Sequence, residues 1–391
     1  MIKKTFILFS AVLYSLFMHY SCIEPYIPES QKDFVPRVIV DGLITNESEN
    51  QVIKLSYTSS IDSLKFDPLS GCFVEVLDDL GNSYFFEESY PGIYNGKITI
   101  ENLIPGTAFQ LHFILNNGEE YESDLETLTN SPPINSIHYL LQTKATTDPE
   151  ISYQGMQFYY NFKATDEYDR YYRLVVEETW EYHAAYPISI FYSGGYQTIS
   201  PDSSLYFCYK TQRINDIFLI STDGFEKNEY ENFQLHFVDN QTQRLRYKYS
   251  LLLKLYSLSR NASNFWVNLK KNSQESGGLY ETQPALVIGN IHHVNYPDEM
   301  VLGYFGVSSV QEKRIFFTKP DDFTFAQDFY CIASKPNIED GWPSQTDPTE
   351  WPIYFLYVFD METEGTILGI APVECFDCTK SGGTTTKPDF W

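Results

Sequence analysis

Basic side chains are scarce in this chain of 391 residues: 27 Lys and Arg stand against 52 Asp and Glu, which leaves a net charge of −25. A surface this acidic repels phosphate backbones and anionic lipid headgroups, so nucleic acid and acidic membrane patches are not expected as partners. No internal repeat of about 20–50 residues is present, which argues against solenoids and propellers. With 43% hydrophobic and 20% charged residues, the sequence is typical of a globular protein with two or three domains.

Motifs for catalysis and metal binding are missing as well. Most histidines are isolated, and the one adjacent pair, His292 and His293, does not lie in an H-E-x-x-H pattern. Neighbouring residues of a strand point to opposite faces, so this pair is not expected to bind one ion together. The acidic clusters at residues 321–322 and 347–350 do not form a calcium loop, and we interpret them as solvated loops. The sequence therefore predicts neither a cofactor nor a metal site.

No apolar run reaches the roughly 20 residues that a bilayer-spanning helix needs. Two lysines precede a shorter apolar run over residues 5–18, which is typical of an export signal. Cys22 follows this run directly, as in the bacterial lipobox, although His19 and Tyr20 are larger than that pattern prefers. We therefore predict a lipoprotein signal peptide over residues 1–21 and lipidation of Cys22, with ordinary cleavage or an uncleaved anchor as the alternative.

The residues after Cys22 support this interpretation. Residues 23–34 hold two prolines and no hydrophobic periodicity that builds a helix or a strand, so residues 22–34 are predicted to form a tether. Loss of the signal peptide removes two lysines and no acids, which lowers the net charge from −25 to −27. The expected mature protein is thus an acidic chain that a lipid, rather than surface charge, holds at a membrane.

Period-two hydrophobic patterns begin after the tether and predict strands. Cys72 shares the core face of one such strand with two valines, whereas His112 faces water from another. The stretches DLGN at residues 79–82 and NNG at residues 116–118 supply turn residues for hairpins. These short strands and turns predict a small antiparallel β-sandwich of immunoglobulin-like or transthyretin-like type over residues 35–130.

The remaining part, residues 134–391, is larger and rich in aromatic residues. Stretches such as ISYQGMQFYYNFKA and RLRYKYSLLLKLYSLS again predict strands. One helix stands out in SRNASNFWVNLKKNSQESGG, where Phe265, Trp266 and Leu269 form an apolar stripe and two glycines end the pattern. The whole chain is therefore predicted to be mainly β, with an aromatic-rich second β domain and one prominent helix.

Six cysteines are present, so five remain after lipidation and at least one thiol must stay unpaired. Cys375 and Cys378 have C-x-x-C spacing, which allows half a zinc site, a redox pair or two halves of separate bridges. No second C-x-x-C or thioredoxin-like pattern accompanies them, so we favour a structural disulfide with Cys331 as the candidate partner. The tail beyond, which ends in Phe390 and Trp391, is expected to dock on the second domain by burying those rings.

Trp342 and Trp351 lie together in a proline-rich loop over residues 335–352. Aromatic side chains on loops commonly mark binding surfaces. We treat both as candidate ligand-facing residues. The alternative is that they cap the core beneath the loop. No residue is assigned a catalytic role.

Several stretches together resemble one known family: CIEPYIPE, VIVDGLIT, FWVNLKKNSQESGGLYE, VLGYFGVSSV and CFDCTKSGGTTTKPDFW. They are similar to the domain-of-unknown-function 4249 family, lipoproteins of the Bacteroidota, over essentially the whole mature chain. The resemblance implies an N-terminal immunoglobulin-like region, a lipid anchor in the outer membrane and genes that often lie beside TonB-dependent receptors. It implies no known activity.

These features favour a non-enzymatic accessory lipoprotein that binds or presents a ligand for a TonB-dependent transporter. It would lie on the cell surface or on the periplasmic face of the outer membrane. A structural or assembly protein of the cell envelope is the alternative. A surface hydrolase acting on peptides or glycans is less favoured, because no acid, base or metal motif supports it.

The substitution Cys22→Ala tests the predicted anchor. The wild type should incorporate a labelled fatty acid and stay with the membrane fraction, whereas the variant should lose the label and become soluble, because the lipid supplies the membrane affinity. Equal labelling of both proteins would show that Cys22 is not the lipidated residue.

Overall fold

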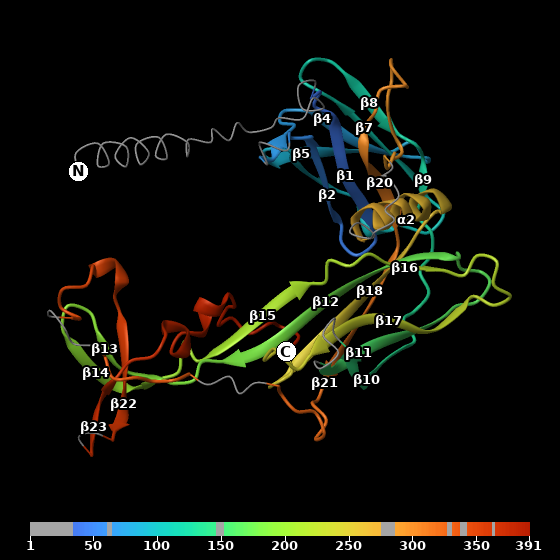
Figure 1. Ribbon diagram of the computed structural model, residues 1–391. Coiled ribbons are helices and arrows are strands. Elements are labelled where there is room, and N and C mark those ends of the chain that lie inside the picture. Colours follow the sequence, from blue (N-terminus) through green and yellow to red (C-terminus); the bar gives the residue numbers. More distant parts are fainter. Residues whose placement is uncertain are drawn as a thin grey trace, which may run out of the picture.

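The structure is a computed structural model that describes residues 34–60, 65–145, 152–274, 286–326, 331–336, 342–361 and 364–391 (Figure 1). The described chain is mainly β and contains one α-helix, as predicted. Cys22, the predicted signal peptide and residues 23–33 of the predicted tether lie outside these residues. In the part that is described, no helix is both long and apolar enough to cross a bilayer.

Eleven short strands of the N-terminal unit join in one sheet. These strands are β1 (Val38–Thr45), β2 (Asn50–Tyr57), β3 (Asp67–Pro68), β4 (Phe73–Asp78), β5 (Ser83–Tyr90), β6 (Ile93–Lys97), β7 (Ala108–Ile114), β8 (Glu120–Ser123), β9 (Glu126–Thr127), β19 (Ile291–His293) and β20 (Leu302–Ser308). Val74 and Val76 of β4 lie beside Phe113 and Leu111 of β7 in the buried core, as the alternation predicts. Cys72 is half-buried and packs against the same core.

The sheet curls until its two edge strands, β19 and β20, come close to each other. Both come from late in the sequence: β19 pairs with β8, and β20 pairs in parallel with β1. Asn290 bridges the remaining gap, because its side-chain amide donates to the carbonyl of Phe305 and accepts from the N–H of Phe305, both at 2.9 Å. One side chain thus replaces the ladder hydrogen bonds missing at this seam. We call this unit the curled sheet.

The second unit is a sandwich of two antiparallel sheets, one with strand order β10-β11-β17 and one with order β15-β12-β18-β21, with β16 beside β12. The strands are β10 (Ser136–Ala145), β11 (Ser152–Lys163), β12 (Tyr171–His183), β15 (Phe207–Arg213), β16 (Phe218–Ser221), β17 (Glu229–Asp239), β18 (Tyr249–Ser257) and β21 (Val310–Phe317). Phe158 and Tyr160 of β11 meet Leu251 and Leu253 of β18 between the sheets. The aromatic-rich strands therefore line one shared core.

Buried serines join the two units where the chain crosses between them. The hydroxyl of Ser131 donates to the carbonyl of Ser309 at 2.7 Å. The hydroxyl of Ser257 donates to the carbonyl of Thr129 at 2.8 Å, and the hydroxyl of Ser308 donates to the carbonyl of Ser257. The link before β10, the end of β18 and the passage from β20 to β21 therefore meet at one hydrogen-bonded point, which we call the serine joint.

Helix α2 (Arg260–Gln274) lies at the junction of the two units (Figure 1). Ser259 caps its start, since its hydroxyl accepts a hydrogen bond at 3.0 Å from the backbone N–H three residues on. Phe265 packs against Tyr304 of β20, and Trp266 lies edge-on to Phe265 in the same cluster. The predicted apolar stripe thus packs between β20 of the curled sheet and strands β12 and β16 of the sandwich. The predicted glycine stop lies outside the described residues.

Four further strands form a lobe at the far end of the sandwich, which we call the distal lobe (Figure 1). They are β13 (Ile188–Tyr192), β14 (Tyr196–Asp202), β22 (Ile353–Asp360) and β23 (Gly365–Gly369), in the order β14-β13-β22-β23. The first two lie between β12 and β15 in the chain, whereas the other two come from near the C-terminus. Segments far apart in the sequence therefore build this lobe together.

The C-terminal tail lies against the sandwich. Thr384 forms a β-bridge with Tyr209 of β15. The indole N–H of Trp391 donates to a carboxylate oxygen of Glu181 at 3.0 Å. A guanidinium of β21 lies 3.4 Å from the ring centroid of Phe390. The tail is therefore docked on the sandwich as expected, but Phe390 stays 40% exposed, so a cation–π contact rather than burial holds that ring.

Asn290→Ala should destabilise the curled sheet by about 1–3 kcal/mol, because it leaves the buried N–H and carbonyl of Phe305 without partners. The free energy of unfolding from urea titration measures the effect. Asn295→Ala, a change at an exposed asparagine after β19, should stay within about 0.5 kcal/mol of the wild type. Equal stability of the two variants would show that the amide bridge does not hold the seam.

Candidate functional site

Two disulfides tie the C-terminal segment to the rest of the chain: Cys208–Cys378 and Cys331–Cys375. The two cysteines of the C-x-x-C pair thus belong to separate bridges, one of the alternatives that their spacing left open. Cys331 pairs with Cys375, but no sequence signal pointed to Cys208, which lies in an ordinary strand. Cys72 is a free thiol, and burial raises its pKa.

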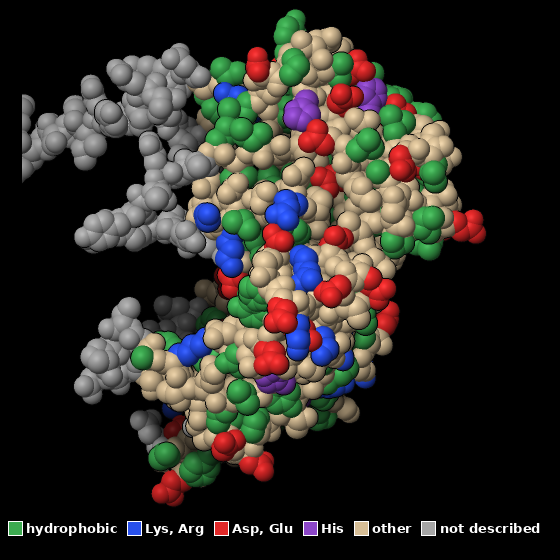
Figure 2. All heavy atoms as spheres, turned by 90° about the vertical axis from the view of Figure 1, so that its right-hand side faces the viewer, with side chains coloured by type: hydrophobic (Ala, Val, Ile, Leu, Met, Phe, Trp, Pro, Cys, Tyr) green, Lys and Arg blue, Asp and Glu red, His purple; other side chains and the backbone are tan. Residues whose placement is uncertain are grey.

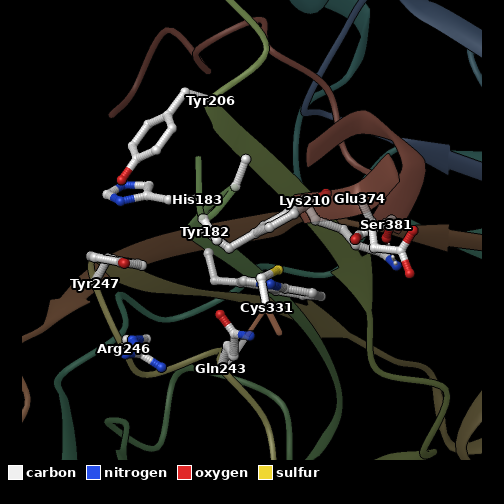
Figure 3. Close-up of a pocket in the computed structure, with 13 residues that line it drawn as sticks. Tyr182, His183, Tyr206, Lys210, Gln243, Arg246, Tyr247, Cys331, Glu374 and Ser381 are labelled. Atoms are coloured by element: carbon white, nitrogen blue, oxygen red, sulfur yellow. Dashed lines mark hydrogen bonds between the residues drawn. The ribbon is translucent and has the colours of Figure 1, made fainter. Parts of the chain in front are cut away.

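A cavity of about 460 Å³ lies where these disulfides meet the end of β12 (Figure 3). Its wall includes Trp180, His183, Tyr206, Lys210, Arg246 and Tyr247. Figure 3 shows Tyr206, His183 and Tyr247 along one side of the space and Lys210, Glu374 and Ser381 on the other. Aromatic rings from the sandwich therefore face polar groups from β15 and the tail.

His183 is held in place from two directions. Its ring centroid lies 3.6 Å from that of Tyr247, and its Nε2 lies 2.7 Å from Oε1 of Glu181. Burial acts to raise the pKa of Glu181, but hydrogen bonds with His183 and Trp391 outweigh burial and lower it. The carboxylate is therefore ionised at neutral pH and keeps the imidazole in one orientation.

The cavity combines stacking surfaces with hydrogen-bond donors. Tyr206 and Tyr247 present ring faces and hydroxyl groups, and Lys210 and Arg246 bring positive charge into a strongly acidic protein. Cys331 also reaches the wall, but its sulfur is engaged in a disulfide. This arrangement is suited to recognising a polar ligand by stacking and hydrogen bonding.

A comparison with known protein families identifies the family of this chain. A family model described as "Domain of unknown function (DUF4249)" matches residues 23–314, well over half of the sequence. The chain belongs to the DUF4249 family. No curated protein matches it. The matched range ends within β21, so the C-terminal strands of the distal lobe in this DUF4249 protein lie beyond the match.

Trp342 and Trp351 both pack on the small core of the distal lobe. The ring of Trp351 lies edge-on to Tyr192 with centroids 5.5 Å apart, and its N–H donates to Thr346 at 2.8 Å. The ring of Trp342 lies 5.7 Å from that of Phe355. The same two tryptophans also line a hollow of about 520 Å³ beside the tail. The packing on the core agrees with the capping alternative, whereas the ligand-facing role of both residues stays a prediction.

An apolar hairpin tip is a feature that the sequence did not single out. Tyr357, Phe359 and Met361, at the end of β22, are 67%, 69% and 87% exposed. The stretch IYFLYVFD is apolar at nearly every position, which indicates a strand buried on both faces. In the distal lobe no described element covers the outer half of this strand. Three large apolar side chains consequently remain in contact with water.

The histidines do not gather into one site in the described ranges. His112 lies between Glu75 and Glu120, with nitrogen-to-oxygen distances of 3.0 and 2.8 Å. His292 contacts a surface carboxylate, whereas His293 is buried and accepts hydrogen bonds from two backbone N–H groups. The pair thus points to opposite faces, as predicted. Within the described residues, no three His, Cys, Asp or Glu side chains are arranged to hold a metal ion.

Replacing either loop tryptophan by alanine should lower the stability of the distal lobe. Trp342→Ala and Trp351→Ala each remove a partly buried ring, at a cost of about 1–3 kcal/mol. Tyr357→Ala, which removes an exposed ring of the same lobe, is the matched control and should leave unfolding unchanged. Thermal unfolding followed by near-ultraviolet circular dichroism separates the two classes. Identical melting of all three variants would contradict the packing role.

Proposed function

We propose that this DUF4249 protein is a non-enzymatic accessory lipoprotein, anchored through Cys22 in the outer membrane, that binds or presents a ligand for a TonB-dependent transporter. The anchored chain lies on the cell surface or on the periplasmic face. The observation that carries the proposal is the uncovered apolar hairpin at the tip of the distal lobe.

The hairpin has the composition of a protein interface. Aromatic residues and methionine are enriched at the centres of interfaces, and Tyr357, Phe359 and Met361 are of these types. Large apolar side chains that lie together on a water-facing surface mark interaction sites more often than isolated ones do. A transporter or another envelope protein that covered them would remove this apolar area from water and gain binding free energy.

The position of the hairpin suits an anchored protein. The tether enters the fold at β1 in the curled sheet, and the distal lobe lies at the other end of the molecule (Figure 1). A lipid at one end and a protein partner at the other do not compete for the same surface. The disulfides at the root of the lobe hold the hairpin in a fixed position, which lowers the entropy lost on binding.

We also infer an immunoglobulin-like or transthyretin-like arrangement for residues 35–130. Its support is the series of antiparallel pairs β4 with β5, β5 with β6 and β7 with β8, joined by short turns, with one face of each strand in a common core. The later strands β19 and β20 are added to this arrangement at its edges.

Capture of partners from the native membrane in mild detergent tests the function. A TonB-dependent receptor should co-purify with the wild type but not with the double variant Tyr357→Ser and Phe359→Ser. The matched control replaces Phe85 and Tyr90 of β5 by serine, since these are 61% and 71% exposed on the curled sheet. This control should still capture the receptor.

The remaining outcomes of this capture experiment decide between the candidate functions. Capture of structural envelope proteins instead of a receptor would favour the second candidate, an assembly protein, which an exposed hairpin also suits. Capture of a receptor by the hairpin variant would show that the hairpin is not the contact surface.

A further inference from the structure

A groove of about 810 Å³ separates the curled sheet from the sandwich. One wall is the outer face of β1 and β20, the second is helix α2, and the third is the outer face of β12, β15 and β18. Leu43 and Val52 from the curled sheet and Phe265 and Leu269 from α2 make much of this surface apolar. A space of this size is typical of sites for small organic molecules, which are often found between domains.

Two arginines lie in this apolar groove. Arg173 of β12 lies opposite Tyr256 of β18, and Arg213 ends β15, where it pairs with Glu177 of β12. Arg173, Arg213 and Tyr256 all line the groove. The guanidinium of Arg173 lies 3.5 Å from the ring centroid of Trp266 on α2, which fixes its position by a cation–π contact.

Neither guanidinium has an acidic partner among the described residues. No carboxylate of that part of the chain lies within 4.0 Å of either one, and neither side chain forms a hydrogen bond there. Glu177, the cross-strand neighbour of Arg213, contacts Arg314 instead at 3.3 Å. Asp41 at the rim is engaged by Lys54, also at 3.3 Å.

Acidic residues outnumber basic ones almost two to one, and four of the eight arginines contact carboxylates: Arg170, Arg244, Arg260 and Arg314. Arg173 and Arg213 differ from the other arginines because both line the same groove without such a partner in the described chain. On the face shown in Figure 2, acidic side chains are spread over both units, and most basic ones lie in the middle and lower part of the view, interspersed with acidic ones.

Two like charges in a partly dry groove raise the free energy of the empty site. Burial, the largest cause, and the nearby Arg213 lower the pKa of Arg173 to about 10, although the charges of Tyr256 and of Asp41 at the rim act in the opposite direction. An anion between the two guanidinium groups would offset this repulsion. Its oxygens would also accept hydrogen bonds from guanidinium N–H groups that otherwise contact only water. The apolar walls meanwhile favour a ligand with a hydrophobic or aromatic body.

We propose that the groove binds a small organic anion, with its carboxylate or phosphate between Arg173 and Arg213 and its apolar body against Trp266 and α2. This site lies outside the distal lobe and does not depend on the proposed transporter partner. The ligand class is set by the pair of planar donor groups, which match the two oxygens of a carboxylate or phosphate.

A matched pair of fluorescent probes tests the proposal on the purified full mature chain. The probe 1-anilinonaphthalene-8-sulfonate carries an anionic group on an aromatic body, and N-phenyl-1-naphthylamine has the same body without the charge. The double variant Arg173→Gln and Arg213→Gln should bind the anionic probe about 10–100-fold more weakly. Its affinity for the neutral probe should stay the same. Equal affinity of wild type and double variant for the anionic probe would overturn the proposal.

Arg37→Gln is the matched control, because Arg37 also has no carboxylate within 4.0 Å in the described chain and its exposed side chain lies outside the groove. It should bind both probes like the wild type. Loss of the anionic probe in Arg246→Gln, and not in the double variant, would place the anion site in the cavity of Figure 3 instead and overturn the proposal. Should the double variant fail to fold, the single change Arg213→Gln, at an exposed side chain, carries the same comparison.

Competition identifies the anion. Benzoate and phenyl phosphate should each be titrated against the bound anionic probe. Displacement by one of them, and not by the other, assigns the site to carboxylates or to phosphates. If neither displaces the probe, the groove does not recognise a small organic anion and the inference is wrong.

Discussion

The serine joint is the constraint on which the rest of the structure depends. The chain leaves the sandwich at Ser257, adds α2, β19 and β20 to the curled sheet, and returns at Ser309. The link from Thr129 to Ser131 reaches the same place and is hydrogen-bonded to both. Because each crossing is short, buried and bonded to another, the two units cannot separate without exposing unpaired polar groups.

The joint explains the groove as well as the connection. β20 runs parallel to β1 in one unit and continues, through Ser309, into β21 of the other. The outer face of the curled sheet is thereby held at a set distance from the outer face of the sandwich. Helix α2 begins three residues after Ser257, and this short connection holds it across the junction. A site with walls from both units therefore needs no closing motion to form.

Local sequence patterns predicted the strands and the helix, because the periodicity of apolar residues that produces these elements is itself local. Alternation placed Val74 and Phe109 in the core, and the stripe through Phe265 and Trp266 gave the buried face of α2. The parallel pairing of β1 with β20 has no local signal, since the partners lie far apart in the sequence and neither strand encodes its neighbour. The curl of the sheet depends on that pairing, so local sequence patterns could not predict it.

The candidate sites also divide into features with a local sequence signal and features that depend on the whole fold. The C-x-x-C spacing indicated that Cys375 and Cys378 would be bridged but not to which partners, because disulfide connectivity depends on the fold. Strand periodicity places Arg173 on one face of β12, yet only the assembled sheets show that Arg213 lines the same groove and that Glu177 is engaged by Arg314. Whether a charged side chain has a partner depends on its neighbours in space, and these neighbours come from distant parts of the chain.

Strand β12 runs from the groove between the units to the cavity below the distal lobe. It carries Arg173 near its start, at the groove, and His183 at its end, in the cavity below the distal lobe. Thirteen residues of strand span about 40 Å. Its ladder to β18 runs without a bulge from Tyr172 to Trp180, and its ladder to β15 continues without a bulge to His183. A strand that is hydrogen-bonded on both sides bends little, so β12 sets the distance between its two ends. The groove of the proposed anion site and the cavity at the root of the distal lobe are therefore held about one strand length apart.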